Sequence, residues 1–134
     1  MKEEIVLSIE AAVGGGSVAV TRGETVLGTW HSREAISRSE ELLMRIAELF
    51  DRLEMGRGSL DRVAVSNGPG SYTGIRVGVA TAMGLARALD IPCTGVSLLK
   101  AIAMTSDGPG DRIVSLPLGR SGYCWQHFNE SGTA

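Results

Sequence analysis

Hydrophobic periodicity changes along this chain from the alternation typical of strands to the spacing typical of helices, and this change constrains the fold most. Residues 5–10, 17–21 and 25–31 are short runs rich in β-branched side chains, separated by turns that contain glycine. Such runs predict three antiparallel strands. Residues 37–54 carry apolar side chains at i, i+3 and i+4 spacing, which predicts an amphipathic helix.

Strand and helix patterns then alternate as far as residue 105. Residues 61–66 predict a buried strand, residues 73–89 a second helix, residues 93–97 another strand and residues 98–105 a short helix. This order requires parallel strands joined by helical crossovers. The sequence therefore predicts an α/β domain in which a mixed five-stranded sheet is flanked by helices.

Residues 106–111 form the strongest boundary signal, because Ser, Asp, Gly, Pro and Gly follow one another there. We therefore expect a first domain at residues 1–106 and a separate hairpin at residues 107–134, with strands near 112–116 and 123–128. A two-stranded unit is marginal alone in water. We expect it to dock on the first domain or to complete a sheet in another chain.

Composition excludes several classes of protein. The 134 residues carry a formal charge of −2, and the positive residues are spread along the chain. Phosphate-driven nucleic-acid binding normally shows as a basic stripe, so a dominant nucleic-acid surface is not expected. No stretch approaches the roughly 18 consecutive apolar residues of a membrane span, and no signal-peptide pattern follows Met1. We expect a cytoplasmic protein.

The residues that commonly carry chemistry are isolated in this sequence. Cys93 and Cys124 have no His or Cys at metal-ligand spacing and lie in apolar contexts, so we expect both to act as small hydrophobes. His31 and His127 belong to no motif that brings an acid, a base and a nucleophile together. The sequence predicts no catalytic residue, no metal and no cofactor.

The segment from Ser66 to Gly78, Ser-Asn-Gly-Pro-Gly-Ser-Tyr-Thr-Gly-Ile-Arg-Val-Gly, connects a predicted strand to a predicted helix. One interpretation is a phosphate loop, because glycines and the N–H groups at a helix start bind anions. It lacks the Lys-Ser/Thr pair of a P-loop and the glycine spacing of a dinucleotide site. The other interpretation is a tight turn with a capping hydroxyl. The residues concerned are Gly68, Gly70, Ser71 and Thr73.

Small residues recur every fourth position in the second predicted helix, at Gly74, Gly78, Ala82 and Ala86. A glycine inside a helix costs about 1 kcal/mol relative to alanine, so close packing must require it. The neighbour is either the protein's own sheet or first helix, or a helix of a partner. Periodicity leaves both interpretations open.

Residues 67–86 closely resemble the TsaB (YeaZ) family, the glycoprotease-like partner protein of bacterial tRNA threonylcarbamoyladenosine synthesis. The resemblance continues through Ile91-Pro92 and the Gly-Val-Ser-Leu run at residues 95–98, and more weakly from residues 39–43 to 118–122. It implies an actin-like ATPase (ribonuclease H-like) fold, which begins with three antiparallel strands followed by helix, strand, helix, strand, helix. The order predicted above is the same.

The resemblance also implies partners. Family members are not themselves the catalyst: they bind a TsaD-like paralogue that modifies tRNA, with a TsaE-like ATPase as third component, so tRNA is contacted only through the complex. The family's dimer contact uses the first two helices, here residues 37–54 and 73–89. We therefore expect a scaffold or a homodimer whose partner interface contains Leu42, Leu43, Ile46, Gly74, Arg76, Gly78, Ala82 and Ala86.

Departures from the family pattern bear on function. Glu10-Ala11-Ala12 stands where the family has an Asp-Thr-Ser-like phosphate turn, which argues against nucleotide binding there. Arg38 and Leu118 replace a His and an Asp, which argues against metal binding or hydrolysis. The chain also contains just the start of the family's second domain. Two alternatives remain: a nucleotide-binding actin-like domain, and a homo-oligomeric module without the modification role.

Overall fold

The computed structural model describes residues 2–33 and 39–134, and for Ser39 and Glu40 the backbone alone. Its elements follow the chain in this order: β1 (Ile5–Glu10), β2 (Ser17–Arg22), β3 (Thr25–His31), α1 (Ser39–Arg52), the 3-10 turn η1 (Arg57–Ser59), β4 (Arg62–Ser66), α2 (Tyr72–Leu89), β5 (Cys93–Val96), α3 (Leu98–Thr105), β6 (Arg112–Leu118) and β7 (Gly122–Phe128).

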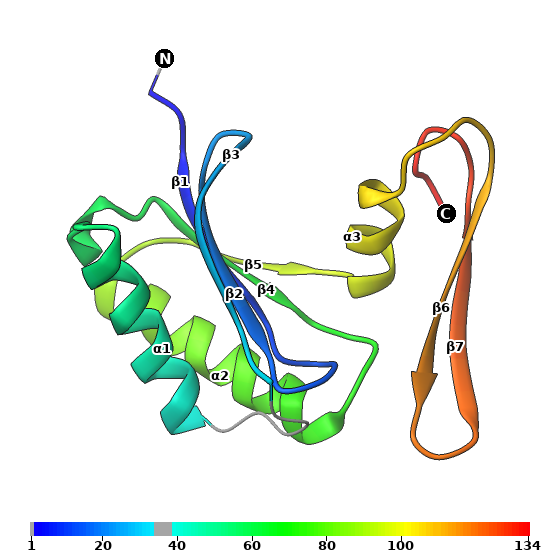
Figure 1. Cartoon of the computed structure of the whole chain (residues 1–134), viewed down its shortest axis with the longest axis horizontal. Coiled ribbons are helices and arrows are strands. Elements are labelled where there is room, and N and C mark those ends of the chain that lie inside the picture. The colour runs from blue at the N-terminus through cyan, green and yellow to red at the C-terminus, as the bar shows by residue number, and fades with distance from the viewer. Residues whose placement is uncertain (1, 34–38) are drawn as a thin grey trace.

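The first five strands form one mixed sheet in the order β3-β2-β1-β4-β5 (Figure 1). Strand β1 pairs antiparallel with β2 and parallel with β4, and β5 extends the parallel half. The register shifts between Val20 and Thr21, where β2 meets β3. The predicted mixed five-stranded sheet is confirmed.

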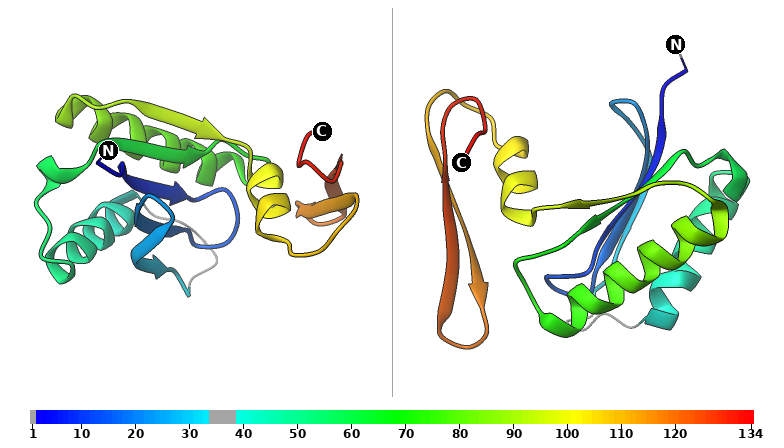
Figure 2. Two further views of the ribbon diagram at one scale, coloured as in Figure 1. Left: turned by 90° about the horizontal axis from the view of Figure 1, so that it is seen from above. Right: turned by 180° about the vertical axis from the view of Figure 1, so that it is seen from behind.

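Helices α1 and α2 lie side by side on one face of this sheet, whereas α3 and the β6–β7 hairpin lie on the other side (Figure 2). Alternation along β1 places Ile5, Leu7 and Ile9 in the core while the residues between them are half-buried. The core under the two helices consists of Ile5, Leu7, Ile9, Val18, Val20, Leu42, Ile46, Leu49, Phe50, Leu60, Val63, Val65, Ala82 and Ala86.

Both long helices end in the same way, with an acidic residue in the left-handed conformation. Glu54 has φ 52° after α1, and Asp90 has φ 54° after α2. The next residue in each case, Met55 or Ile91, donates its N–H to a carbonyl five positions earlier. This bond satisfies a carbonyl that the helix leaves open. The predicted start of the first helix, at residue 37, lies outside the described residues.

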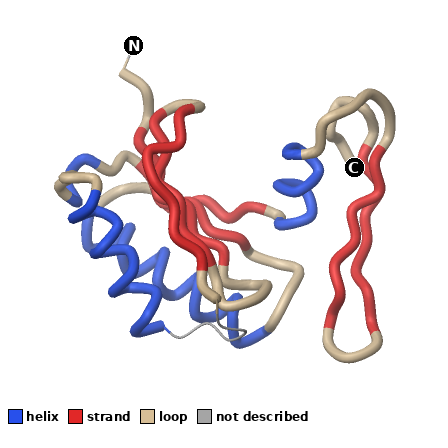
Figure 3. Tube along the Cα trace, in the orientation of Figure 1, coloured by secondary structure: helices blue, strands red, loops and turns tan. Residues whose placement is uncertain are grey.

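The hairpin and α3 share a second, smaller core. Leu99 and Ala103 of α3 pack with Val114 and Phe128 of the hairpin, all at most 7% exposed. In Figure 3 the two hairpin strands stand apart from the strands of the large sheet. The hairpin thus docks on α3, one of the two expected outcomes, while the domain boundary at residues 106–111 stays a prediction. Cys124 borders this core, whereas Cys93 is exposed on the edge strand β5.

Six of the eight predicted interface residues belong to the protein's own core. Leu42, Ile46, Ala82 and Ala86 are at most 5% exposed. Gly74 and Gly78 are also buried, and α2 presents them with the two alanines to the sheet. Their assignment to a partner surface is corrected: the small side chains bring α2 close to its own sheet.

We call Gly74, Gly78, Ala82 and Ala86 of α2 the stripe. The space around the stripe explains its two glycines. A Cβ atom at Gly74 would overlap the carbonyl oxygen of Ala11, which is backbone and cannot move aside easily. A Cβ at Gly78 would lie 3.1 Å from the Cβ of Ala11 and 3.6 Å from Cγ2 of Val65. Gly84 is on the exposed side of the helix and has nothing within 4 Å of such an atom.

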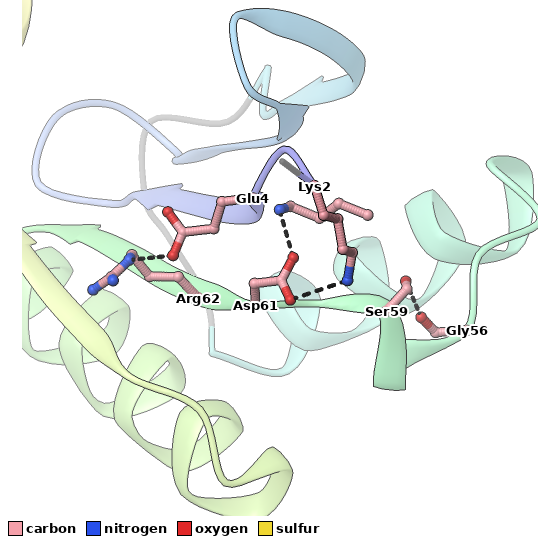
Figure 4. A network of polar contacts seen from close by, with 7 residues as sticks. Lys2, Glu4, Gly56, Ser59, Asp61 and Arg62 are labelled. Atoms are coloured by element: carbon pink, nitrogen blue, oxygen red, sulfur yellow. Dashed lines mark hydrogen bonds and ion pairs between the residues drawn. The ribbon is translucent and has the colours of Figure 1, made fainter.

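Polar contacts fix the start of β1 beside β4 (Figure 4). The Asp61 carboxylate accepts the N–H of Ile5 at 2.8 Å and lies 3.4 Å from Nζ of Lys2. Arg62 donates from Nε to Glu4 at 3.0 Å. The hydrogen bond from Ile5, assisted by the charge of Lys2, lowers the pKa of Asp61 below its ordinary value.

Replacing the same residue type at two positions of α2 tests the packing of the stripe. We expect Gly74→Ala to lower the free energy of unfolding by about 1–3 kcal/mol, because the added methyl group meets backbone. Gly84→Ala should raise it by about 1 kcal/mol through helix propensity. Urea unfolding followed by circular dichroism measures both. Stabilisation by both substitutions would contradict the packing described above, and Gly78→Ala gives a milder variant if Gly74→Ala does not fold.

The lowered pKa of Asp61 predicts a pH dependence of stability. A carboxyl group whose pKa is depressed in the folded state stabilises the protein above its unfolded pKa, roughly 3.9, and loses this effect as pH falls through the folded value. Asp61→Asn should therefore lower the urea midpoint at pH 7 and reduce its decrease on acidification. Asp107→Asn in the exposed 106–111 turn serves as the control. Equal pH profiles for wild type and Asp61→Asn would refute the assignment.

Candidate functional site

The outer side of α1 and α2 carries large apolar side chains. Leu43 and Met44 of α1 are 48% and 50% exposed, and Tyr72 and Met83 of α2 are 75% and 59% exposed. Tyr72, Arg76 and Met83 have i, i+4 and i+11 spacing, which aligns them on the side of α2 opposite the buried stripe. We call Leu43, Met44, Tyr72, Arg76 and Met83 the helical face.

Arg76 shapes the helical face. Its guanidinium lies over the ring of Tyr72, 5.3 Å from the centroid, a distance typical of a cation–π contact. It also borders a shallow groove of about 310 Å³ that is lined by Thr73, Arg76, Val77, Ala80 and Thr81. The result is an aromatic ring and a cation beside a groove.

Charged side chains border α1 toward the edge strand β3. Arg45 forms ion pairs with Glu48 at 2.9 Å and with Glu41 at 3.7 Å, and its guanidinium lies 5.7 Å from the centre of the Trp30 ring. The two carboxylates, Glu48 first, raise the pKa of Arg45. This cluster fixes a polar border at one side of the helices.

Of the predicted interface residues, the structure leaves Leu43 and Arg76 on the helical face. Met44, Tyr72 and Met83 are exposed residues that the sequence prediction missed. The available signal was their phase: they are apolar side chains that fall outside the i, i+3, i+4 set of the buried face. Apolar residues out of phase with a core pattern indicate a second, exposed face.

The glycine-rich loop packs against the turn after β1. Gly70 is in contact with Ala12, where a Cβ atom would overlap the Ala12 carbonyl. The N–H of Ser71 donates to that same carbonyl at 2.7 Å. The Ser71 hydroxyl accepts the N–H of Gly74 at 3.2 Å and so caps α2. The tight-turn interpretation accounts for these residues.

Gly68 and Thr73, the other two residues of the predicted phosphate loop, do not converge with Gly70 and Ser71. Gly68 is buried with φ 109°, a conformation that favours glycine, and its carbonyl accepts the N–H of Leu98 at 2.9 Å. Thr73 is exposed and lines the groove of α2. Ser71 and Gly70 are held by Ala12 as described, so the four residues do not surround a common space.

The Glu10 carboxylate accepts hydrogen bonds from the N–H groups that an anion at the turn after β1 would need. It accepts the N–H of Ala12 at 2.5 Å and that of Val13 at 3.1 Å. Burial raises the pKa of Glu10, and these two hydrogen bonds oppose the rise. A phosphate at this turn would meet a carboxylate that already binds the amides, so the geometry disfavours it.

An open cleft of about 340 Å³ lies over the sheet face that α1 and α2 leave uncovered. Side chains from the sheet, among them Ser8, Glu10 and Ala64, line it, as do Leu98 and Ala101. Ser17 is the register partner of both Glu10 and His31. No side-chain hydrogen bond joins Ser17 to His31 in the described part of the chain.

Two further properties concern residues 2–33 and 39–134. Within them no three His, Cys, Asp or Glu side chains are placed to hold a metal ion together. Within the same residues no helix combines the length and the apolarity needed to cross a membrane.

Comparison with known proteins identifies the family. A family model described as TsaD, tRNA N6-adenosine threonylcarbamoyltransferase, matches residues 33–120. The tRNA threonylcarbamoyladenosine biosynthesis protein TsaB of Bacillus subtilis is 33% identical over 98 residues, which are 73% of this chain and 43% of that protein. TsaB of Haemophilus influenzae is 33% identical over 79% of this chain and 44% of its own length. The chain thus spans less than half the length of these relatives.

The solved structures agree on the fold. YeaZ from Pseudomonas aeruginosa superposes with a TM-score of 0.82 at 23% identity, over 97% of this chain and 62% of that one. This likeness confirms the predicted actin-like, ribonuclease H-like fold. With the sequence matches to the TsaB proteins, it leads to one conclusion: the chain belongs to the TsaB (YeaZ) family.

Proposed function

We propose that this chain is a non-catalytic scaffold of bacterial tRNA threonylcarbamoyladenosine modification, and that it binds a TsaD-like paralogue through the helical face. Family membership supports the pathway, because the relatives are named as biosynthesis proteins of this nucleoside. In this proposal the protein acts in the cytoplasm. A TsaE-like ATPase joins the same complex, and tRNA is contacted through the catalytic subunit.

The exposure of the helical face is the observation that carries this proposal. Its four apolar side chains are each about half or more exposed, on two helices that lie side by side on one face of the sheet. Aromatic residues, Met and Arg are enriched where proteins meet, and a few of them dominate the binding energy. A partner helix that packs on α1 and α2 would cover these side chains together.

The turn after β1 supports a scaffold over the nucleotide-binding alternative. Glu10 holds the N–H groups of Ala12 and Val13, and the glycines of the following loop are in contact with Ala11 and Ala12. Opening this arrangement for a phosphate would break these hydrogen bonds and bring two negative charges together. The loop and the turn after β1 thus use these groups for packing and hydrogen bonds within the protein.

Two exposed methionines test the interface. We expect Met83→Glu on the helical face to weaken binding of the TsaD-like protein from the same organism at least tenfold, about 1.4 kcal/mol, because a charge would be buried in the contact. Met104→Glu on α3 is the matched control, since Met104 is 72% exposed on the opposite side of the sheet. Titration calorimetry measures both affinities.

The difference in affinity between Met83→Glu and Met104→Glu decides the outcome. Circular dichroism should show both to be folded, because neither side chain is in the core. Equal affinities for wild type and Met83→Glu, together with an unchanged affinity for Leu43→Glu, would exclude the helical face as the contact. No binding by the wild-type chain would exclude the scaffold itself.

A further inference from the structure

Helix α2 carries charge of one sign. Residues 72–89 contain no Asp or Glu, and the side chains charged at neutral pH are Arg76 and Arg87, both exposed. Their i, i+11 spacing is about three helical turns, so both lie on the same side of α2 as Tyr72 and Met83. Helix α1 differs, because it contains both acidic and basic residues. The part of the helical face that α2 contributes is therefore positive.

The dipole of α2 accounts for Arg87 but not for Arg76. Arg87 belongs to the last turn, where the partial negative charge of the helix C-terminus favours a cation. Arg76 lies near the other end, in the turn that follows the N-cap Ser71, and a cation gains nothing from the positive end of a helix. An interaction outside α2 would account for its charge.

This interaction is not an ion pair within the described chain. Arg62, for comparison, lies 3.0 Å from a carboxylate oxygen of Glu4. Among the side chains that the structure describes, no Asp or Glu forms such a pair with Arg76. A guanidinium has five N–H donors, and the face of the Tyr72 ring attracts its charge without accepting these hydrogens one by one. The donors of Arg76 are therefore available to a partner.

Tyr72 also positions the guanidinium. The cation–π contact at 5.3 Å holds the end of a long, flexible side chain over the ring, at the border of the groove of α2. A side chain that is already held in place loses less conformational entropy when a partner binds. Arg76 is thus a cation arranged in advance among the apolar side chains of the helical face.

We infer that the partner places a carboxylate on Arg76, within a surface whose other contacting side chains are apolar. The inference rests on the proposed function and adds to it the chemistry of the partner's surface. A partner that covers Tyr72 and Met83 also removes water from Arg76, which lies between them on α2, and a buried charge without a counter-charge is costly. A carboxylate offsets this cost best, because a guanidinium can donate two parallel hydrogen bonds to it.

The charge of the neighbouring helix disfavours a nucleic acid as the occupant. Binding along a phosphate backbone requires several cations, and the helical face contributes Arg76 alone. Helix α1 adds the carboxylates of Glu41, Glu48 and Asp51, which repel a row of phosphates. A single carboxylate at Arg76 instead meets α2, which contains no acidic residue.

Substitutions at two arginines test the inference, with titration calorimetry against the TsaD-like protein from the same organism. We expect Arg76→Gln to weaken binding at least about tenfold. Arg76→Glu should weaken it further, because two carboxylates then face each other. Arg76→Lys should be intermediate, since an ammonium group pairs without the planar fork. Arg87→Gln removes the same charge from the same helix and should change the affinity less than about threefold, as an exposed charge does.

Salt and the Tyr72 ring give readouts that a mere loss of packing would not change. Ionic strength weakens an ion pair, so the wild-type affinity should fall between roughly 50 and 500 mM NaCl, and that of Arg76→Gln should fall less. Tyr72→Leu removes the ring under the guanidinium and should weaken binding severalfold. Tyr72→Phe keeps the ring face and should bind like the wild type.

The outcomes separate this inference from the proposed function. Equal affinities for wild type and Arg76→Gln, with Met83→Glu still weakened, would overturn the inference and leave the helical face as the contact. No binding by the wild-type chain would overturn both. Equal losses in Arg76→Gln and Arg76→Glu, with unchanged salt dependence, would show that Arg76 packs without meeting a carboxylate.

A different occupant of Arg76 would also be detected. Binding of a single-stranded oligonucleotide, or self-association, that Arg76→Gln abolishes while the affinity for the TsaD-like protein is unchanged would assign Arg76 to that contact and overturn the inference. Circular dichroism of the Arg76 variants should remain that of the wild type, since the side chain is exposed.

Discussion

The close approach of α2 to the turn after β1 is the contact on which the rest of this structure depends. Gly70 and Gly74 bring the start of the helix against the backbone of Ala11 and Ala12, and Gly78 continues the contact toward Val65. Van der Waals attraction acts only at short range. Glycine has no side chain, so it lets the two backbones approach closely enough to gain this attraction. This contact fixes the axis of α2 on the sheet and thereby the direction in which its outer side faces.

The same contact engages backbone groups at both ends of the glycine-rich loop's approach to the first turn. A carbonyl of the first turn accepts the N–H of Ser71, and the amides of that turn are bound by Glu10. Backbone groups that are satisfied inside the fold are not available to a ligand.

The sequence predicted the order of elements and the mixed sheet because periodicity is a local property, visible within each segment. It also showed that α2 must approach another backbone closely. It could not show which one, because Ala11 and Gly74 are some sixty positions apart and nothing local links them. Leu42 and Ile46 were placed at a partner surface because the resemblance implies a dimer contact through the first two helices. Tyr72 was missed because the predicted helix began at residue 73, one position after the start that the structure shows.

The inner and outer sides of α2 are physically linked. A helix held this close to the sheet has room for Gly and Ala beneath it, but none for a ring or a thioether. Tyr72 and Met83 would not fit on the inner side, so their exposure follows from the packing that the glycines permit. Folding thus requires small residues on the inner side of α2. The residues on its outer side do not face this requirement and can be selected for binding.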